Sequence, residues 1–142
     1  MIINLSREEM QKNFASWLIA WDNYDLEGVL DWMHDDVVFE NWDGKVVTGK
    51  SDLQKAWLPW FIFNGNFKFY NEDVFIDEEK QKLSFQWRLE WPSPEKNYKG
   101  LPEIRRGVDV IHFLQGKIIK KYSFSKTIIQ IDNKLVLLTA SN

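Results

Sequence analysis

The sequence predicts an α+β fold in a single domain that spans residues 1–142. Up to Leu58, apolar side chains recur at helical spacing, whereas from Phe67 onward apolar and polar residues alternate. No internal repeat, low-complexity tract or linker divides the chain, and its length fits one domain. Helices first and a series of long strands afterwards is the order typical of α+β proteins.

Two helices are expected at the start of the chain. Ser6 and Glu9 form the S-x-x-E pattern of a capping box. The helix that follows ends near Trp21 and carries one apolar stripe, made of Met10, Phe14, Trp17, Leu18 and Trp21. Asp25 is placed to cap a second, short helix with an apolar face.

Two short strands and a third helix complete the first half of the chain. The strands are expected at 37–40 and 45–47, on either side of a turn that ends at Gly44. The third helix is predicted from Gly49 to about Leu58, because Pro59 ends or kinks a helix.

The second half is predicted to be a meander of long strands. They are expected at 67–77, 81–91, 104–114 and 117–129, with a last short strand at 135–138. Residues 92–102 contain three Pro and one Gly and are therefore expected to form a loop. A loop of this length is often functional or mobile.

Asp109 stands out because it lies inside a predicted strand, between Val108 and Val110, where aspartate is uncommon. If Gln115 and Gly116 form a two-residue turn, Asp109 faces Tyr122 across the hairpin. If the turn instead takes a third residue with a bulge, the partner becomes Ser123.

Two interpretations of Asp109 follow from the first register. In an apolar pocket beside Tyr122, desolvation would raise the pKa of Asp109, and the neutral acid could donate a hydrogen bond to a developing oxyanion. Alternatively, Asp109 is structural. It then either bonds to Tyr122 only to close the core or pairs with one of the basic residues Arg105, Arg106 and Lys120.

The composition restricts the possible functions. The chain has eight Trp, ten Phe and four Tyr, which indicates either an aromatic core or the walls of a cavity for an apolar or planar ligand. The candidate ligand-binding residues are Trp17, Asn41, Trp57, Trp60, Trp87 and Ile111. Neither a metal site nor a cofactor is expected, because there is no Cys, the two His lack ligand spacing, and nucleotide motifs are absent.

The charge pattern and apolar runs bear on partners and location. The net charge is −3 with scattered basic residues, which argues against nucleic-acid binding. No apolar run approaches the roughly 20 residues of a membrane span, and the start of the chain does not read as a signal peptide. We therefore expect a cytoplasmic protein. Because both faces of the long hairpin are largely apolar, we expect a homodimer through the open face of the sheet.

The order of these motifs resembles the nuclear transport factor 2-like superfamily, and within it the SnoaL-like proteins. The segments that carry the resemblance are D-L-E-G from Asp25, D-D-V-V-F-E-N from Asp35, V-T-G-K from Val47 and G-V-D-V-I-H-F-L-Q-G-K-I-I from Gly107. Relatives include ketosteroid isomerases, polyketide cyclases and limonene-epoxide hydrolase. The resemblance implies a cone-shaped, curved antiparallel sheet wrapped on three N-terminal helices, with an internal pocket.

The resemblance also implies roles for individual residues. Asp109 falls at the oxyanion-hole position of ketosteroid isomerases, and Trp17 replaces their helix Tyr. Asn41 stands where they carry the proton-shuttling Asp, with Glu40 beside it as the substitute. Asp109, Tyr122 and Glu40 are therefore the candidate catalytic residues. The expected function is binding of an apolar or aromatic small molecule, with cofactor-free acid–base catalysis of the isomerase, cyclase or dehydratase type. The alternative is a non-catalytic module for ligand binding or protein interaction.

Overall fold

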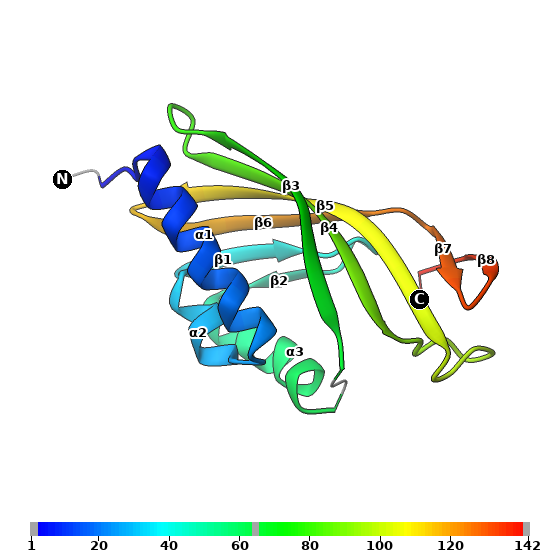
Figure 1. The fold of residues 1–142 in the computed structure, drawn as a ribbon. Coiled ribbons are helices and arrows are strands. Elements are labelled where there is room, and N and C mark those ends of the chain that lie inside the picture. The colour runs from blue at the N-terminus through cyan, green and yellow to red at the C-terminus, as the bar shows by residue number, and fades with distance from the viewer. Residues whose placement is uncertain (1–2, 64–65, 141–142) are drawn as a thin grey trace.

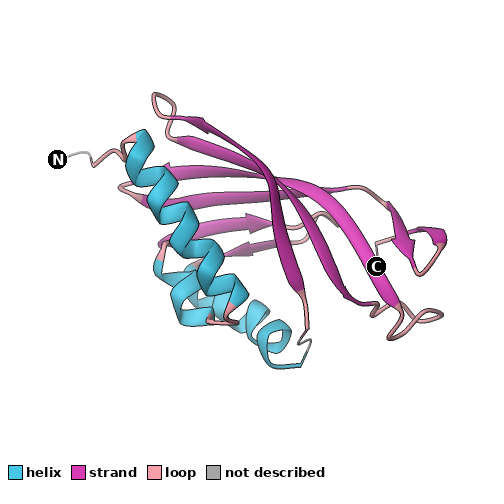
Figure 2. Ribbon diagram, in the orientation of Figure 1, coloured by secondary structure: helices cyan, strands magenta, loops and turns pink. Residues whose placement is uncertain are grey.

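The computed structural model describes residues 3–63 and 66–140 and confirms the α+β fold. The helices of this part of the chain are α1 (Arg7–Asp22), α2 (Leu26–Asp31) and α3 (Lys50–Phe63). Its strands are β1 (Met33–Glu40), β2 (Val46–Thr48), β3 (Lys68–Asp77), β4 (Lys82–Pro92), β5 (Pro102–Leu114), β6 (Lys117–Ser125), β7 (Ile128–Ile131) and β8 (Lys134–Leu137). The helices gather on one side of a strongly curled sheet (Figures 1 and 2).

The two N-terminal helices begin as the sequence predicts. The Ser6 hydroxyl accepts the amide proton of Glu9, and the Glu9 carboxylate accepts that of Ser6, so the capping box is complete. The Asp25 carboxylate accepts from the amide of Gly28 and caps α2. The apolar stripe of α1 is buried against the sheet, which fixes the side of the sheet on which the helices lie.

The third helix differs from the prediction because it runs through Pro59 to Phe63. Proline lacks the amide proton for the bond to the carbonyl four residues earlier, so this helix has lost one of its internal bonds. The extra turn places Trp60 and Phe61 against Trp21 and Phe67. This aromatic packing holds the helix together beyond the proline.

The sheet has the order β2-β1-β6-β5-β4-β3, and β7 adds to the outer end of β5. The pairs among β3, β4, β5 and β6 are antiparallel as expected, whereas β1 runs parallel to β6. The sheet is therefore mixed rather than wholly antiparallel. The predicted strand 117–129 is two strands, because the chain leaves the sheet after Ser125 and returns as β7. Figure 1 shows β7 and β8 as a separate hairpin beyond the end of β6.

The core lies between the helices and the concave face of the sheet. On β4, Leu83, Phe85, Trp87 and Leu89 point inward and are buried, as their alternation predicts. A second, smaller cluster of Ile129, Ile131 and Leu138 forms under β7, where Trp42 and Tyr98 pack on it. No helix among the described residues is long and apolar enough to cross a membrane.

Candidate functional site

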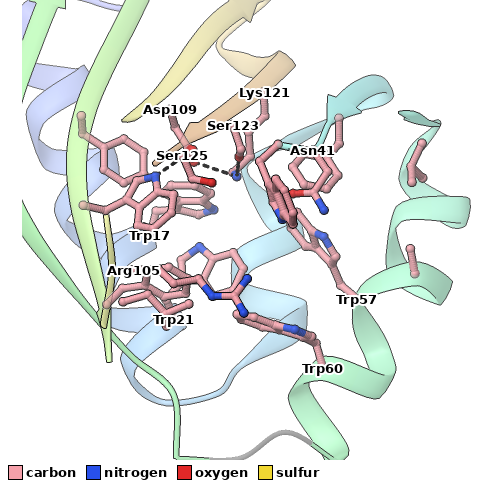
Figure 3. Close-up of a pocket in the computed structure, with 18 of the residues that line it drawn as sticks. Trp17, Trp21, Asn41, Trp57, Trp60, Arg105, Asp109, Lys121, Ser123 and Ser125 are labelled. Atoms are coloured by element: carbon pink, nitrogen blue, oxygen red, sulfur yellow. Dashed lines mark hydrogen bonds and ion pairs between the residues drawn. The ribbon is translucent and has the colours of Figure 1, made fainter. Parts of the chain in front are cut away.

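A cavity of about 390 Å³ opens between the helices and the concave face of the sheet. This volume lies within the roughly 300–1,000 Å³ of small-molecule sites. Most of its wall is aromatic or aliphatic, and Figure 3 shows the polar side chains that interrupt this wall. The lining aromatic residues are Trp17, Trp21, Phe39, Trp42, Trp57, Trp60, Phe69, Phe85, Trp87 and Trp91.

Asp109 lies in this cavity and is 3% exposed. Its Oδ1 accepts a hydrogen bond from the indole Nε1 of Trp87 at 2.9 Å. Its Oδ2 lies 2.7 Å from the Nζ of Lys121, which is 6% exposed. Lys121 also donates to the Ser123 hydroxyl at 3.2 Å. The site is thus built around a buried ion pair with an indole on one side and a hydroxyl on the other (Figure 3).

Gly107 allows Trp87 to reach Asp109. The two residues are direct partners across β4 and β5, and a Cβ atom at position 107 would lie 2.4 Å from Cζ2 of the Trp87 ring. The ring therefore occupies the space that any larger residue would fill. The glycine of the G-V-D motif holds the indole over the strand and directs its N–H toward the carboxylate.

The prediction that Asp109 faces Tyr122 is wrong, because Asp109 pairs with Ser123. The two-residue turn is present, since Leu114 pairs with Lys117. A β-bulge follows, because His112 pairs with Lys120 while Phe113 pairs with Ile118, which leaves Ile119 as the extra residue. The alternative register was therefore the correct one, although the extra residue lies in the strand instead of the turn.

The bulge decides which side chains of β6 enter the cavity. Beyond it, Lys121, Ser123 and Ser125 point inward and line the cavity. Without the extra residue, the inward positions would be those of Lys120, Tyr122 and Phe124. One inserted residue thus exchanges a mostly aromatic strand face for a polar one.

Two of the predicted catalytic residues lie outside the cavity. Tyr122 is on the opposite face of the sheet, where its ring centroid is 5.7 Å from that of His112. Glu40, at the end of β1, is exposed and pairs with Tyr122 in the parallel register. The structure therefore does not bring Tyr122 or Glu40 together with Asp109.

Most of the predicted ligand-binding residues do line the cavity. Trp17, Asn41, Trp57, Trp60 and Trp87 all contribute to its wall. The sixth, Ile111, is fully buried and belongs to the core next to the cavity. The side chains of Phe39 and Trp57 also lie beside the ammonium group of Lys121, whose Nζ is 4.8 Å and 5.6 Å from their ring centroids.

A second polar network reaches the cavity through Arg105, which lines it. The Glu103 carboxylate is 1% exposed and accepts from Arg105 Nε at 2.6 Å, from Ser93 Oγ at 2.9 Å and from the Trp91 indole. Arg105 also contacts Glu95 of the 93–101 loop at 3.3 Å. This network ties the loop to β4 and β5.

The sequence prediction missed Lys121, Ser125 and Arg105 as cavity residues. Arg105 could have been found from alternation, because positions 105, 107 and 109 share one face of β5. Lys121 and Ser125 could be found only with the bulge in place. Within the described residues, no group of three His, Asp or Glu side chains gathers as metal ligands.

The geometry defines what the polar corner can do chemically. Asp109 accepts from two donors and is therefore an ionised acceptor rather than a donor in this arrangement. The group that can donate to an oxyanion is the ammonium of Lys121, which has three protons and uses them toward two acceptors. The carboxylate is in turn the group that can accept a proton from a bound molecule.

The chain is similar to known proteins both in its sequence and in its fold. The sequence profile of the SnoaL-like domain family matches residues 14–121. No curated protein matches the sequence significantly. Several solved structures have a similar fold at low sequence identity.

Three of these structures are AclR, TerC and a ketosteroid isomerase homologue. AclR, a putative hydroxylase from Streptomyces galilaeus, gives a TM-score of 0.70 at 14% identity, over 85% of this chain and 81% of that chain. TerC, co-crystallized with polyporic acid, gives a TM-score of 0.69 at 14% identity, over 82% of this chain and 91% of that chain. A putative ketosteroid isomerase from Kribbella flavida gives a TM-score of 0.66 at 13% identity, over 81% of this chain and 76% of that chain.

Proposed function

Because the chain belongs to the SnoaL-like domain family, we propose that its cavity binds an apolar or aromatic small molecule. The observation that carries the proposal is a cavity of about 390 Å³ walled mainly by tryptophan and phenylalanine rings, with a few polar groups among them. Aromatic walls with few, well-placed polar groups are the usual make-up of ligand sites. That TerC was co-crystallized with polyporic acid also supports a small organic ligand.

Helix α3 offers a test of the proposal, because it carries residues that line the cavity and residues that do not. Trp57 and Trp60 both line the cavity, whereas Leu58, on the same helix, does not line it and is 43% exposed. We expect purified protein to bind a bicyclic aromatic probe, 2-naphthamide or 2-naphthoate, in isothermal titration calorimetry. Trp57→Ala should weaken that binding by up to about tenfold, since an aromatic contact contributes about 0.5–1.5 kcal/mol beyond area burial.

The control is Leu58→Ala, which should bind the probes as the wild type does. If neither probe binds at millimolar concentration, or if both variants weaken binding equally, the cavity is not the ligand site. Binding without turnover is the outcome expected for a non-catalytic module.

A second candidate is cofactor-free acid–base catalysis, favoured by the ion pair of Asp109 and Lys121 inside the cavity. Asp109 would accept a proton from a carbon atom beside a carbonyl group, and Lys121 would donate a proton to the carbonyl oxygen. This proton transfer is the step shared by isomerase- and cyclase-type reactions on ketones. It gives Lys121 the donor role that the sequence prediction gave to Asp109.

Catalysis can be tested without knowing the substrate. In D2O the protein should accelerate exchange of the α-protons of 2-tetralone, a cyclic ketone with a fused benzene ring, as followed by NMR. Asp109→Asn should abolish the acceleration, because an amide cannot accept the proton. Unchanged exchange in the presence of wild-type protein that binds the ketone would leave binding alone as the function.

A further inference from the structure

The inward row of β6 contains a buried hydroxyl without a partner. Lys121, Ser123 and Ser125 alternate along the strand and all line the cavity. Within the described residues, the Ser125 Oγ is buried and forms no hydrogen bond. Its partner across the sheet is Gly107, which offers no side chain. Burying an unpaired hydroxyl is unfavourable. Rotation of the Ser125 side chain toward the cavity would bring its Oγ within reach of a polar atom there.

The polar corner offers unused hydrogen-bond donors beside its unused acceptors. The Asp109 carboxylate already accepts from Trp87 and Lys121. Lys121 has three protons and directs them at two protein acceptors. The Ser123 oxygen accepts from Lys121, which leaves its own proton for another acceptor. A ligand group in this corner therefore meets Lys121, Ser123 and Ser125 as donors.

Cations outnumber anions among the side chains that line the cavity. The charged residues that line it are Lys45, Arg105, Asp109 and Lys121, three cations and one anion, in a chain whose net charge is −3. Outside this lining, Glu103 and Glu95 pair with Arg105 and Asp43 pairs with Lys45, so each of the three cations has an acidic partner. An anionic group is favoured here over a cationic one, because it would face the ammonium of Lys121.

The spacing of the two serines indicates the type of anion. Residues 123 and 125 point the same way along a strand and are about 6.6 Å apart. A single oxygen forming two hydrogen bonds of about 2.75 Å reaches across at most about 5.5 Å. The two oxygens of one carboxylate reach further, so a carboxylate fits this pair of hydroxyls better than a phenolate does.

We propose that the ligand of this cavity is an aromatic carboxylic acid, bound as the anion. Its carboxylate accepts hydrogen bonds from Lys121, Ser123 and Ser125, and its ring lies among the tryptophans between this corner and Arg105. Figure 3 shows Asp109, Lys121 and Ser123 at one end of the cavity, with Arg105, Trp21 and Trp60 at the other. This inference rests on the proposed function, since it names the ligand class of the same site.

The test compares two probes of equal shape, 2-naphthoate and 2-naphthamide, by isothermal titration calorimetry at pH 7. We expect the carboxylate to bind at least about tenfold more tightly than the amide, a difference of about 1.4 kcal/mol. Ser125→Ala should lower the affinity for 2-naphthoate about five- to tenfold and leave 2-naphthamide unchanged. The control is Ser84→Ala on β4, a partly buried strand serine that does not line the cavity, which should change neither affinity.

A second variant tests the cation without leaving a buried charge unpaired. The double variant Asp109→Asn with Lys121→Met keeps an acceptor for the Trp87 indole and removes both charges. It should bind both probes with similar affinity. Equal affinity of the wild type for the two probes, or a preference that survives in the double variant, would overturn the carboxylate inference while the proposed function stands. Binding of neither probe would overturn both.

Discussion

Residues of three strands shape the surroundings of the Asp109 carboxylate. Trp87 on β4 and Lys121 on β6 both contact it, and the absence of a side chain at Gly107 on its own strand, β5, leaves room for the indole. Taking two charges out of water is costly, and a buried ion pair is weak evidence for stability. A buried ion pair that lines a cavity is typical of a binding or catalytic site, because a bound molecule can use its charges.

The ion pair leads to a prediction for stability. Lys121→Met leaves the Asp109 carboxylate buried and unpaired, so the free energy of unfolding should fall by about 3–5 kcal/mol. Adding Asp109→Asn removes the unpaired charge and should restore much of the loss. Urea denaturation of the wild type, both single variants and the double variant measures the coupling. Equal destabilisation by Lys121→Met in the presence and absence of Asp109→Asn would show that the two side chains are not coupled.

His112 is the other residue whose protonation the fold controls. It lies on the convex face beside Tyr122, and burial is the main cause that lowers its pKa below the ordinary 6.5, with Lys82 and Lys120 adding repulsion. The folded protein thus binds the His112 proton less readily than the unfolded chain does. The stabilising contribution is complete above the ordinary pKa and is lost as the pH falls from that value through the folded pKa.

NMR titration of the imidazole resonances tests this expectation. The His112 signal, assigned by its absence in His112→Gln, should titrate below 6.5. The urea stability of the wild type should decrease more between neutral and mildly acid pH than that of His112→Gln. A His112 pKa at or above the ordinary value would contradict the expectation.

At the scale of single elements, helix α3 shows packing outweighing local preference. Pro59 predicts the end of the helix, yet the helix continues to Phe63 because Trp60 and Phe61 pack into the aromatic core. We expect Pro59→Ala to raise the free energy of unfolding by about 1 kcal/mol or more, since it restores a backbone bond, less the entropy that proline removes from the unfolded chain. Urea denaturation at pH 7 measures the change. A loss of stability would show that this helix requires the proline geometry.

The strands differ in how well the sequence predicts them. The alternation of Leu83, Phe85, Trp87 and Leu89 carries its own evidence for a half-buried strand, and the prediction of 81–91 agrees with β4 within a residue. The β5–β6 hairpin lacks such evidence. The side chains of Tyr122 and Phe124 favour the register that turns them inward, and only the bulge at Ile119 turns Lys121, Ser123 and Ser125 inward instead.

The register of the β5–β6 hairpin determines which side chains of β6 were expected in the candidate site. Asp109 and five of the predicted wall residues line the cavity, and their strands and helices have clear patterns in the sequence. Lys121 and Ser125 were missed and Tyr122 was misplaced because a bulge at Ile119 is set by the pairing of β6 with both β5 and β1, which is tertiary information. The errors on β6 thus follow from one unpredicted residue of register, whereas Arg105 on β5 was missed although its alternation with Asp109 was visible in the sequence.

At the scale of the whole molecule, the curled sheet has two unlike faces. The concave face holds the core and the cavity, and the convex face has no helix over it (Figure 1). Apolar side chains remain on the convex face, among them Phe75 at 62% and Phe124 at 54% exposure, with Val110 and Tyr122 partly exposed. Exposed apolar side chains that gather on one uncovered face are typical of interaction sites. The expectation of a homodimer through this face therefore stands as our prediction.

Phe124 offers a clean test of the dimer, because its side chain is mostly exposed and a charge there should leave the monomer folded. We expect the wild type to sediment as a dimer at micromolar concentration and Phe124→Lys to sediment as a monomer. Leu135→Lys is the matched control, since Leu135 is 80% exposed but lies on β8, away from the convex face of β5 and β6.

Because His112 is on the convex face and burial disfavours its charged form, acidification should also weaken the dimer. A wild-type monomer, or a dimer that Phe124→Lys leaves intact, would refute an interface on this face.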